Sequence, residues 1–279
     1  MRLHTVPAGV PRMALRQYLP RAFPAMPGWV ARETLKKKDV RVNGARSGAD
    51  AMIGAGDELT LYVDDRYLTG LPDVIYEDGS LLVVDKPAGL PVDSDGQGVG
   101  ADTMLSRLRA LCPAARLCHR LDTYTGGVLI AAKTDAAEAR MREVFRAHAL
   151  TKLYECVVLG DPPADEARLL GWLAKDAKAA RVRVLDHFSP GALSIETRYR
   201  VLARKDGLAR LEVNLITGRT HQIRAHLSHV GLPILGDDKY GDREANRRVK
   251  APQPLLWCTR IHFGEYDFRS RPKFGVFEF

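Results

Sequence analysis

The 279-residue sequence lacks the long apolar run that a membrane-spanning helix requires. A helix that crosses a bilayer takes roughly 20 consecutive apolar residues, and no stretch approaches that length. The first residues, MRLHTVPAGVPRM, also lack the apolar stretch of a signal peptide. We therefore expect the protein to stay in the cytoplasm and to have no membrane partner.

Cysteine is scarce, and its spacing matches no familiar motif. No C-x-x-C pair occurs, so the sequence does not support a zinc ribbon or a thioredoxin motif. Scattered thiols are typical of a reducing cytosol, and we expect all of them to be buried and inert. The sequence also contains no internal repeat, which argues against a solenoid. The four cysteines are Cys112, Cys118, Cys156 and Cys258.

What the sequence does have is an excess of positive charge. There are 42 Lys and Arg residues against 34 Asp and Glu residues, which gives a net charge of +8. Such an excess favours a polyanionic partner, because cationic side chains that neutralise phosphates release counterions. The hydrophobic fraction of 46% is sufficient for a packed core. We therefore predict a globular protein that binds nucleic acid.

The first part of the chain, residues 11–63, has the pattern of a small α/β domain. Apolar spacing predicts a short helix near Leu15 and a second helix over residues 30–38. A short strand, VRVNG, then enters a turn at Asn43-Gly44, and ELTLYV closes the segment as another strand. The polar stretch 64–73 contains Gly70 and Pro72 and is typical of a linker.

This order of helix, helix, strand, turn and strand, with the strings VRVNG and AGDELTLYV, resembles the S4 RNA-binding domain. The resemblance implies that the two helices present basic residues to RNA. The alternative is a solvated, charged helix face that binds nothing. The basic residues that we expect to contact RNA are Arg12, Arg16, Arg32, Lys36, Lys37 and Lys38.

Residues 74–279 are rich in strands. LLVVD at 81–85 and GVLIAA at 127–132 are nearly continuous apolar runs, as in strands buried on both faces. Residues 210–215 alternate between apolar and polar, which predicts a half-buried strand. Because strands and helices do not alternate strictly, we predict an α+β fold with a mixed, mainly antiparallel sheet.

One segment, CHRLDTYTGGVLI, places Asp122 in a Thr- and Gly-rich loop directly before a buried strand. A loop fixed by such a strand can hold a reactive side chain in a defined position. His119 and Arg120 lie beside the acid and could keep it ionised or bind a phosphate. The residues alone also fit a structural Asx turn or a surface ion pair.

The H-R-L-D-x-x-T-x-G pattern of this segment closely resembles the catalytic loop of the RluA family of pseudouridine synthases. Three further segments resemble that family in the same order: DKPAGLPV at 85–92, KLYECVVLG at 152–160, and the long stretch at 214–241. The resemblance spans residues 74–268 and implies the pseudouridine synthase fold. The chain departs from the family pattern at Tyr124 and Gly126, where a charged residue and a serine are usual.

The resemblance implies a role for each matching residue. Asp122 is the catalytic aspartate, Tyr154 stacks on the target base, and Arg224 pairs with the catalytic carboxylate. The residues we expect to bind substrate are Arg120, His119, Thr125, Arg219, His221 and Lys86.

The reaction implied is the isomerisation of uridine to pseudouridine in structured RNA. Nothing is oxidised and no group leaves the nucleotide, so we expect no cofactor and no metal. A base inside folded RNA must be flipped out before it can turn. Asp122 either attacks C1′ or promotes a glycal, and the sequence leaves both routes open. Large-subunit ribosomal RNA is the favoured target, transfer RNA the alternative, and we expect a monomer.

Three other readings compete with this one. A non-catalytic RNA-binding or ribosome-assembly factor would share the basic charge and the S4-like segment. A metal enzyme would need ligands such as His221, His226 and His229, whose spacing fits one helix face poorly. A glycoside hydrolase would need a second carboxylate, for which Asp85, Asp93 and Asp95 are the candidates.

Overall fold

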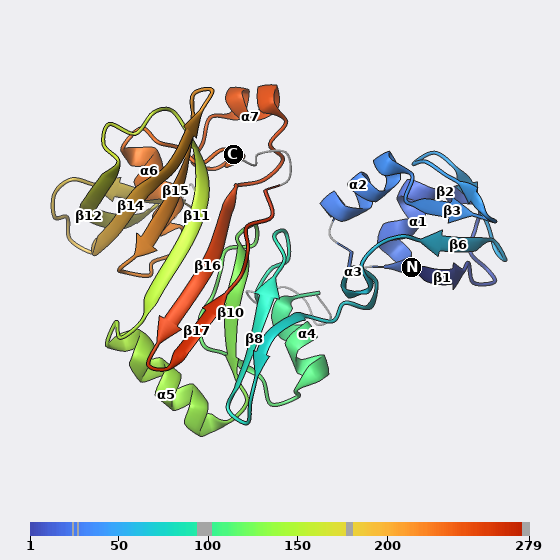
Figure 1. Ribbon diagram of the computed structural model, residues 1–279, viewed down its shortest axis with the longest axis horizontal. Coiled ribbons are helices and arrows are strands. Elements are labelled where there is room, and N and C mark those ends of the chain that lie inside the picture. The colour runs from blue at the N-terminus through green and yellow to red at the C-terminus, as the bar shows by residue number, and fades with distance from the viewer. Residues whose placement is uncertain (24, 27, 94–101, 177–180, 275–279) are drawn as a thin grey trace. The chain divides into compact units, whose positions relative to one another are not determined.

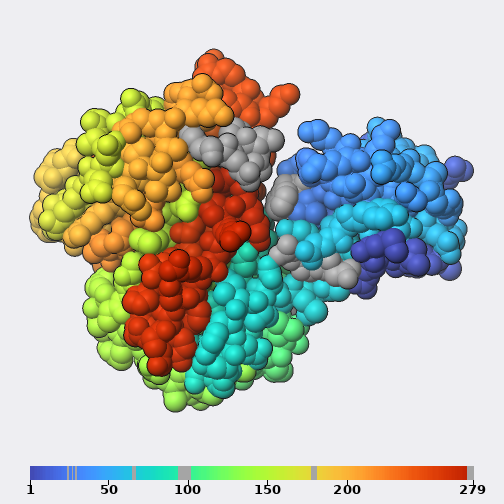
Figure 2. Space-filling view, viewed as in Figure 1, coloured from blue at the N-terminus to red at the C-terminus, as the bar shows by residue number. Residues whose placement is uncertain are grey.

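A computed structural model describes residues 1–279 except 24, 27, 94–101, 177–180 and 275–279. The chain forms two compact units (Figure 1). The small unit comprises Met1–Asp73 and Gly89–Pro113, and the large unit comprises Val74–Ala88 and Ala114–Phe279. Side chains fill the spaces between the ribbons within each unit (Figure 2).

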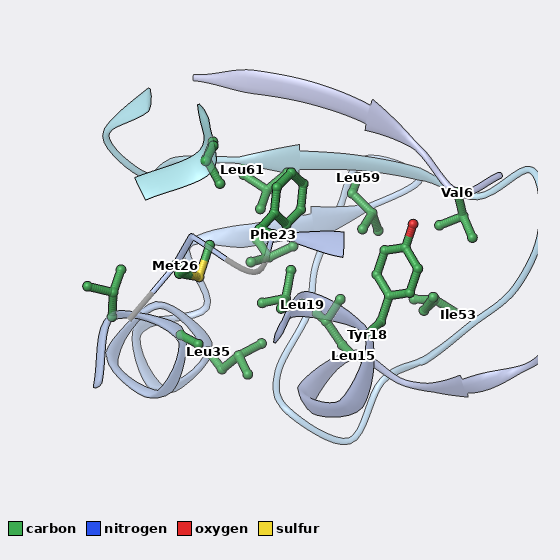
Figure 3. Packing of buried hydrophobic residues seen from close by; sticks show 14 of the residues in the cluster. Val6, Leu15, Tyr18, Leu19, Phe23, Met26, Leu35, Ile53, Leu59 and Leu61 are labelled. Carbon is green, nitrogen blue, oxygen red and sulfur yellow. The ribbon is translucent and has the colours of Figure 1, made fainter. Parts of the chain in front are cut away.

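The small unit packs helices against a four-stranded sheet of order β1-β6-β3-β4. Asn43 and Gly44 connect β3 to β4 with positive φ angles of 49° and 82°, the backbone that a two-residue hairpin turn requires. Leu15 and Leu19 pack against Leu59 and Leu61 of the sheet, and all four are fully buried (Figure 3). The elements are β1 (Arg2–Thr5), β2 (Met13–Ala14), α1 (Leu15–Ala22), α2 (Gly28–Lys37), β3 (Val40–Val42), β4 (Ala45–Arg46), β5 (Met52–Ile53), β6 (Glu58–Leu61), α3 (Asp65–Thr69) and α4 (Met104–Leu111).

The predicted order of helix, helix, strand, turn and strand is present, but the small unit is larger than the predicted span of 11–63. Strand β1 lies before residue 11 and pairs with β6 along its whole length. The predicted linker 64–73 contains α3, and Leu68 is buried in the core of the unit. Such short elements at the edge of a domain carry too little periodicity to be recognised from the sequence.

The large unit is built on one eleven-stranded sheet. Its order is β13-β12-β14-β15-β11-β16-β10-β8-β7, with β17 paired to β16 and β9 paired to β10. All named pairs are antiparallel except β10 with β16, which confirms the predicted mixed, mainly antiparallel sheet. The strands are β7 (Asp73–Glu77), β8 (Leu81–Lys86), β9 (Arg116–Leu117), β10 (Gly126–Ala132), β11 (Thr151–Leu159), β12 (Glu166–Asp176), β13 (Arg181–Leu185), β14 (Leu193–Lys205), β15 (Leu208–Leu215), β16 (Leu256–Phe263) and β17 (Tyr266–Arg269).

Burial explains the two strand patterns that the sequence showed. Every residue of β10 is buried and β8 is nearly so, as their apolar runs predicted. Strand β15 alternates between buried and half-buried residues, as its alternating sequence predicted. The helices of this unit are α5 (Asp135–Arg146), α6 (Gln222–His229) and α7 (Arg243–Val249), and α6 packs on β12, β13 and β14.

Two smaller expectations can be compared with the structure. No helix within the described residues is both long enough and apolar enough to span a bilayer. All four cysteines are free thiols. Cys156 and Cys258 are buried as predicted, whereas Cys112 and Cys118 are half-buried, so the expectation of complete burial is wrong for these two.

Candidate active site

Asp122 lies in the loop between β9 and β10, and the start of β10 holds this loop in place. The backbone N–H of Thr125 donates to the Asp122 carbonyl oxygen at 3.0 Å and closes a tight turn. Gly127 has a φ of +109°, and a Cβ there would collide with the backbone of Cys258 on β16. The close approach of β10 and β16 therefore requires glycine at this position. The Asp122 side chain keeps 23% exposure, so it is open to a substrate.

The side chain of Arg224, on α6, bridges two carboxylates. Its Nη1 donates to Asp122 Oδ2 at 2.9 Å. Its Nε and Nη2 donate to the two oxygens of Asp237 at 2.7 and 3.0 Å. Burial lowers the pKa of the Arg224 guanidinium, but the hydrogen bonds and charges of Asp237 and Asp122 raise it overall. Arg224 is thus a permanent positive charge against the carboxylate of Asp122, as the resemblance implied.

The sequence reasoning missed Asp237 and Tyr240, which hold Arg224 from the other side. Asp237 is fully buried and accepts backbone N–H groups from Lys239 and Tyr240 at 2.9 and 3.0 Å. The Tyr240 ring lies 5.2 Å from the Arg224 guanidinium carbon, and its hydroxyl contacts His221 Nδ1 at 2.9 Å. Both residues lie in the G-D-D-K-Y-G string that ends the matched segment, so the motif was the available signal.

Tyr154 lies on β11 opposite Cys258 of β16, with the register shifted between Leu153 and Tyr154. The extra residue on β16 is Thr259, a bulge of the kind that re-aims side chains beside active sites. Burial raises the pKa of the Tyr154 hydroxyl well above its usual value, and the Cys258 thiol and the charge of Asp122 raise it further. The hydroxyl is therefore protonated at neutral pH.

Lys86, which we predicted to bind substrate, is fully buried. It is the end of β8, has no exposed surface, and donates from Nζ to the carbonyl oxygens of Pro87 and Thr123 at 2.9 and 3.0 Å. Burial lowers the pKa of its ammonium to about 7, although the charges of Asp122 and Asp85 oppose the shift. Because Thr123 follows Asp122 directly, Lys86 supports the catalytic loop from inside the protein.

His119 and Thr125, also predicted to bind substrate, make contacts within the large unit. His119 accepts the backbone N–H of Ile130 at its Nε2 and stacks on Phe145 with ring centroids 5.2 Å apart. Burial, together with the charge of Lys152, lowers the pKa of His119 to about 3, so its ring is neutral. Thr125 is only 3% exposed. His119 is half-buried, and the contact of both side chains with RNA stays a prediction.

The remaining predicted binding residues lie at the surface. In the large unit, Arg120 and Arg219 are exposed and His221 is half-exposed. His221 has a left-handed backbone at the start of α6, and its ring lies close enough to Asp122 to feel its charge. Arg32, Lys36 and Lys37 are exposed on α2 of the small unit. Their contact with RNA stays a prediction.

The described residues of the competing readings have separate partners in the structure. His221, His226 and His229 bond to three different partners: Tyr240, Thr197 and Asp186. Across the described part of the chain, no three His, Cys, Asp or Glu side chains form a group that could hold a metal. Asp85 is bound to Ser270 and Lys273, Asp93 belongs to the small unit, and Asp95 lies outside the described residues.

The large unit thus carries Asp122 paired to Arg224, with Asp237 on the other side of the arginine and the buried Tyr154 on β11. A family model described as RNA pseudouridylate synthase matches residues 80–229, more than half of the chain. The chain therefore belongs to the RNA pseudouridylate synthase family and is an isomerase that acts on RNA.

Individual relatives agree with this membership. The chain is 36% identical to the ribosomal large subunit pseudouridine synthase C of Escherichia coli (strain K12), over 77% of this chain and 72% of that protein. The chain is 34% identical to the ribosomal large subunit pseudouridine synthase C of Vibrio cholerae, over 78% of this chain and 73% of that protein. Among solved structures, human RNA pseudouridylate synthase domain containing 1 shares the fold at a TM-score of 0.62 and 23% identity, over 72% of this chain and 83% of that chain.

Proposed function

We propose that this enzyme isomerises uridines of large-subunit ribosomal RNA, with Asp122 as the carboxylate that acts on the sugar. The observation that carries the proposal is the ion pair of 2.9 Å between Asp122 and Arg224. The names of the relatives from Escherichia coli and Vibrio cholerae, both ribosomal large subunit enzymes, support the choice of RNA.

The chemistry requires the N1–C1′ bond of uridine to break and a C5–C1′ bond to form. Asp122 supplies a carboxylate that attacks C1′ or assists removal of the C2′ proton, and Arg224 stabilises its negative charge. After the base has turned, C5 loses its proton and N1 gains one, so uridine and pseudouridine have the same composition. All the groups that this balance needs are side chains of the protein or water.

Tyr154 is suited to two tasks in this sequence of steps. Its ring offers a stacking surface worth roughly 1–3 kcal/mol per base, which offsets part of the few kcal/mol that flipping costs. Its hydroxyl is protonated at neutral pH, so it can pass a proton during the loss of the C5 hydrogen.

In this proposal the small unit provides additional contacts to the RNA. Its order of elements supports an S4-like RNA-binding module, and Arg32, Lys36 and Lys37 on α2 would contact phosphates. We further propose that the enzyme acts as a cytoplasmic monomer. Those phosphate contacts would weaken steeply as salt concentration rises.

The experiment compares wild type with Asp122→Asn on large-subunit ribosomal RNA and on transfer RNA. The RNA is digested to nucleosides and pseudouridine is quantified, while RNA binding and thermal unfolding are measured in parallel. The proposal predicts pseudouridine in ribosomal RNA from wild type and none from the variant, with binding and stability retained. Product in transfer RNA alone would refute the proposed target, and equal product from both proteins would refute the role of Asp122. Binding by both without product would favour a non-catalytic RNA-binding factor.

A further inference from the structure

Lys152 lies on the same face of the sheet as Tyr154 but has no role in the site described above. The two residues are two positions apart on β11, so their side chains point to one face. The Lys152 ammonium is 5.9 Å from the centroid of the Phe145 ring. An added Cβ at Gly218, in the loop before α6, would lie 2.9 Å from Lys152 Nζ. We call the space bounded by Lys152, Phe145 and Gly218 the Lys152 niche.

The Lys152 ammonium has no polar partner in the part of the chain that the structure describes. Among the residues that the structure describes, none accepts a hydrogen bond from its Nζ or forms an ion pair with it. Other lysines of the large unit do have such partners: Lys133 binds Glu77 at 2.7 Å and Lys273 binds Asp85 at 2.6 Å. A half-buried ammonium carries three hydrogen-bond donors that need acceptors. An ammonium without a partner beside an active site is therefore a candidate to bind an anionic ligand.

The neighbours of the Lys152 niche supply no negative charge. His119 is neutral, and burial raises the pKa of the Cys258 thiol to about 12, so the thiol is protonated. Phe145 contributes only the face of its ring. The niche therefore holds an uncompensated positive charge at the face that carries Tyr154, and burial lowers the pKa of the Lys152 ammonium.

Gly218 keeps the niche open. A side chain at this position would lie against Nζ and cover it, while the glycine leaves the ammonium accessible from the loop. The next residue, Arg219, is exposed and adds a second cation to the same loop. An ammonium beside a loop that carries a further cation is suited to an oxyanion, and in an RNA enzyme the oxyanion is a phosphate.

We propose that Lys152 binds a backbone phosphate of the RNA beside the target nucleotide, with Gly218 leaving it access. The inference rests on the proposed placement of the base on Tyr154, since a phosphate next to that base lies within reach of its strand neighbour. The contact holds the RNA in register before the reaction and takes no part in breaking the glycosidic bond.

The test uses the full-length enzyme with Lys152→Met, Lys152→Arg and Lys205→Met. Lys205 is an exposed lysine at the end of β14, so its variant is a matched control for loss of charge. RNA affinity is measured by fluorescence anisotropy over a range of salt concentrations, on whichever RNA the wild type modifies. The single-turnover rate is measured at saturating enzyme, and thermal unfolding confirms that each variant is folded.

We expect Lys152→Met to weaken binding by about 3- to 10-fold and to reduce the slope of log affinity against log salt by about 0.7–0.9. Lys152→Arg restores the slope, Lys205→Met leaves it unchanged, and the saturated rate is the same in all. The proposal is overturned if Lys152→Met has the same salt slope as wild type. It is also overturned if Lys152→Met and Lys205→Met lose the same amount of RNA affinity. A lower saturated rate with an unchanged slope would place Lys152 at the base instead and also overturns it. A different target RNA would refute only the proposed target, because the salt slope is measured on the RNA that the enzyme modifies.

Discussion

Arg224 and Asp122 lie 102 residues apart in the sequence, yet their side chains meet at 2.9 Å. The arginine reaches the loop because Asp237 holds its other two nitrogens and the ring of Tyr240 lies beside it. A guanidinium held by the buried Asp237 and bordered by the Tyr240 ring presents its third nitrogen in one place. The arrangement is therefore pre-organised for the charge that Asp122 carries.

Asp237→Asn should impair both folding and catalysis. The substitution keeps the size of the side chain but removes the charge that pairs with the largely buried Arg224. Breaking such a pair costs about 3–5 kcal/mol in the free energy of unfolding. Displacement of Arg224 should lower the single-turnover rate on the order of 100-fold, because small misplacements at a reacting centre are costly. Chemical denaturation and a rate measurement on bound RNA check the two effects separately.

A double-mutant cycle shows whether Asp237 acts through Arg224. In an Arg224→Met background, Asp237→Asn should cause almost no further loss of rate. It should also recover stability there, since it removes a buried charge that has lost its partner. Equal losses of rate in both backgrounds would mean that Asp237 supports the fold without acting through the arginine.

Tyr154→Phe separates the ring of this residue from its hydroxyl. The ring remains able to stack on a base, so RNA affinity should be unchanged. The rate at saturation should fall by about 10²- to 10⁴-fold if the hydroxyl relays a proton. Cys258→Ala is the matched control, because it removes the thiol beside Tyr154 and keeps the hydroxyl. A wild-type rate for Tyr154→Phe would exclude the relay.

Lys86→Met should change the pH dependence of stability. The folded-state pKa of Lys86 is about 7 against 10.5 for the free side chain, so between these values the unfolded chain binds more protons. Wild-type stability should therefore rise across this range relative to Lys86→Met, by an amount on the order of a few kcal/mol. Below pH 7 the buried ammonium imposes its full cost and the difference is constant. Denaturant titrations between pH 6 and about 10 measure the difference, and parallel curves would contradict the prediction.

Gly127→Ala should destabilise the large unit more than an ordinary glycine substitution does. The position combines a φ of +109° with a collision against the Cys258 backbone. Gly207→Ala is the control, because its φ is +75° and nothing lies within 4 Å of an added Cβ. Gly207→Ala should lower the free energy of unfolding by about 1–2 kcal/mol, from backbone strain alone. We expect a clearly larger loss for Gly127→Ala in denaturant unfolding, and similar values would mean that the strands can separate without cost.

The fold class could be predicted because the strongest patterns are local. The apolar run of β10 predicts burial on both faces, and the alternation of β15 predicts burial on one face. Strand β1 was missed because four mostly exposed residues have no periodicity to detect. It forms only because β6 offers it a partner, which no sequence window around residues 2–5 contains.

Part of the candidate site could also be predicted from local motifs, and part depends on the folded structure. Asp122, Tyr154 and Arg224 stand in motifs, and the structure brings Arg224 to Asp122. Lys86 was predicted to bind substrate because it lies in the D-K-P-A-G-L-P-V segment that resembles the family. Its burial depends on two backbone carbonyl groups, of Pro87 and Thr123, whose positions depend on the folded loop.

Motifs and periodicity are properties of neighbouring residues, so they predicted the family, the mainly antiparallel sheet and the candidate residues Asp122, Tyr154 and Arg224. Which charges are paired depends on the tertiary structure. Asp237 neutralises Arg224, Lys86 lies inside the protein, and Lys152 has no partner among the described residues, although all three are charged residues in matched segments. The physical reason is that the free energy of a charge depends on its distance from other groups and on its exposure to water, and both are set only when distant strands and helices come together.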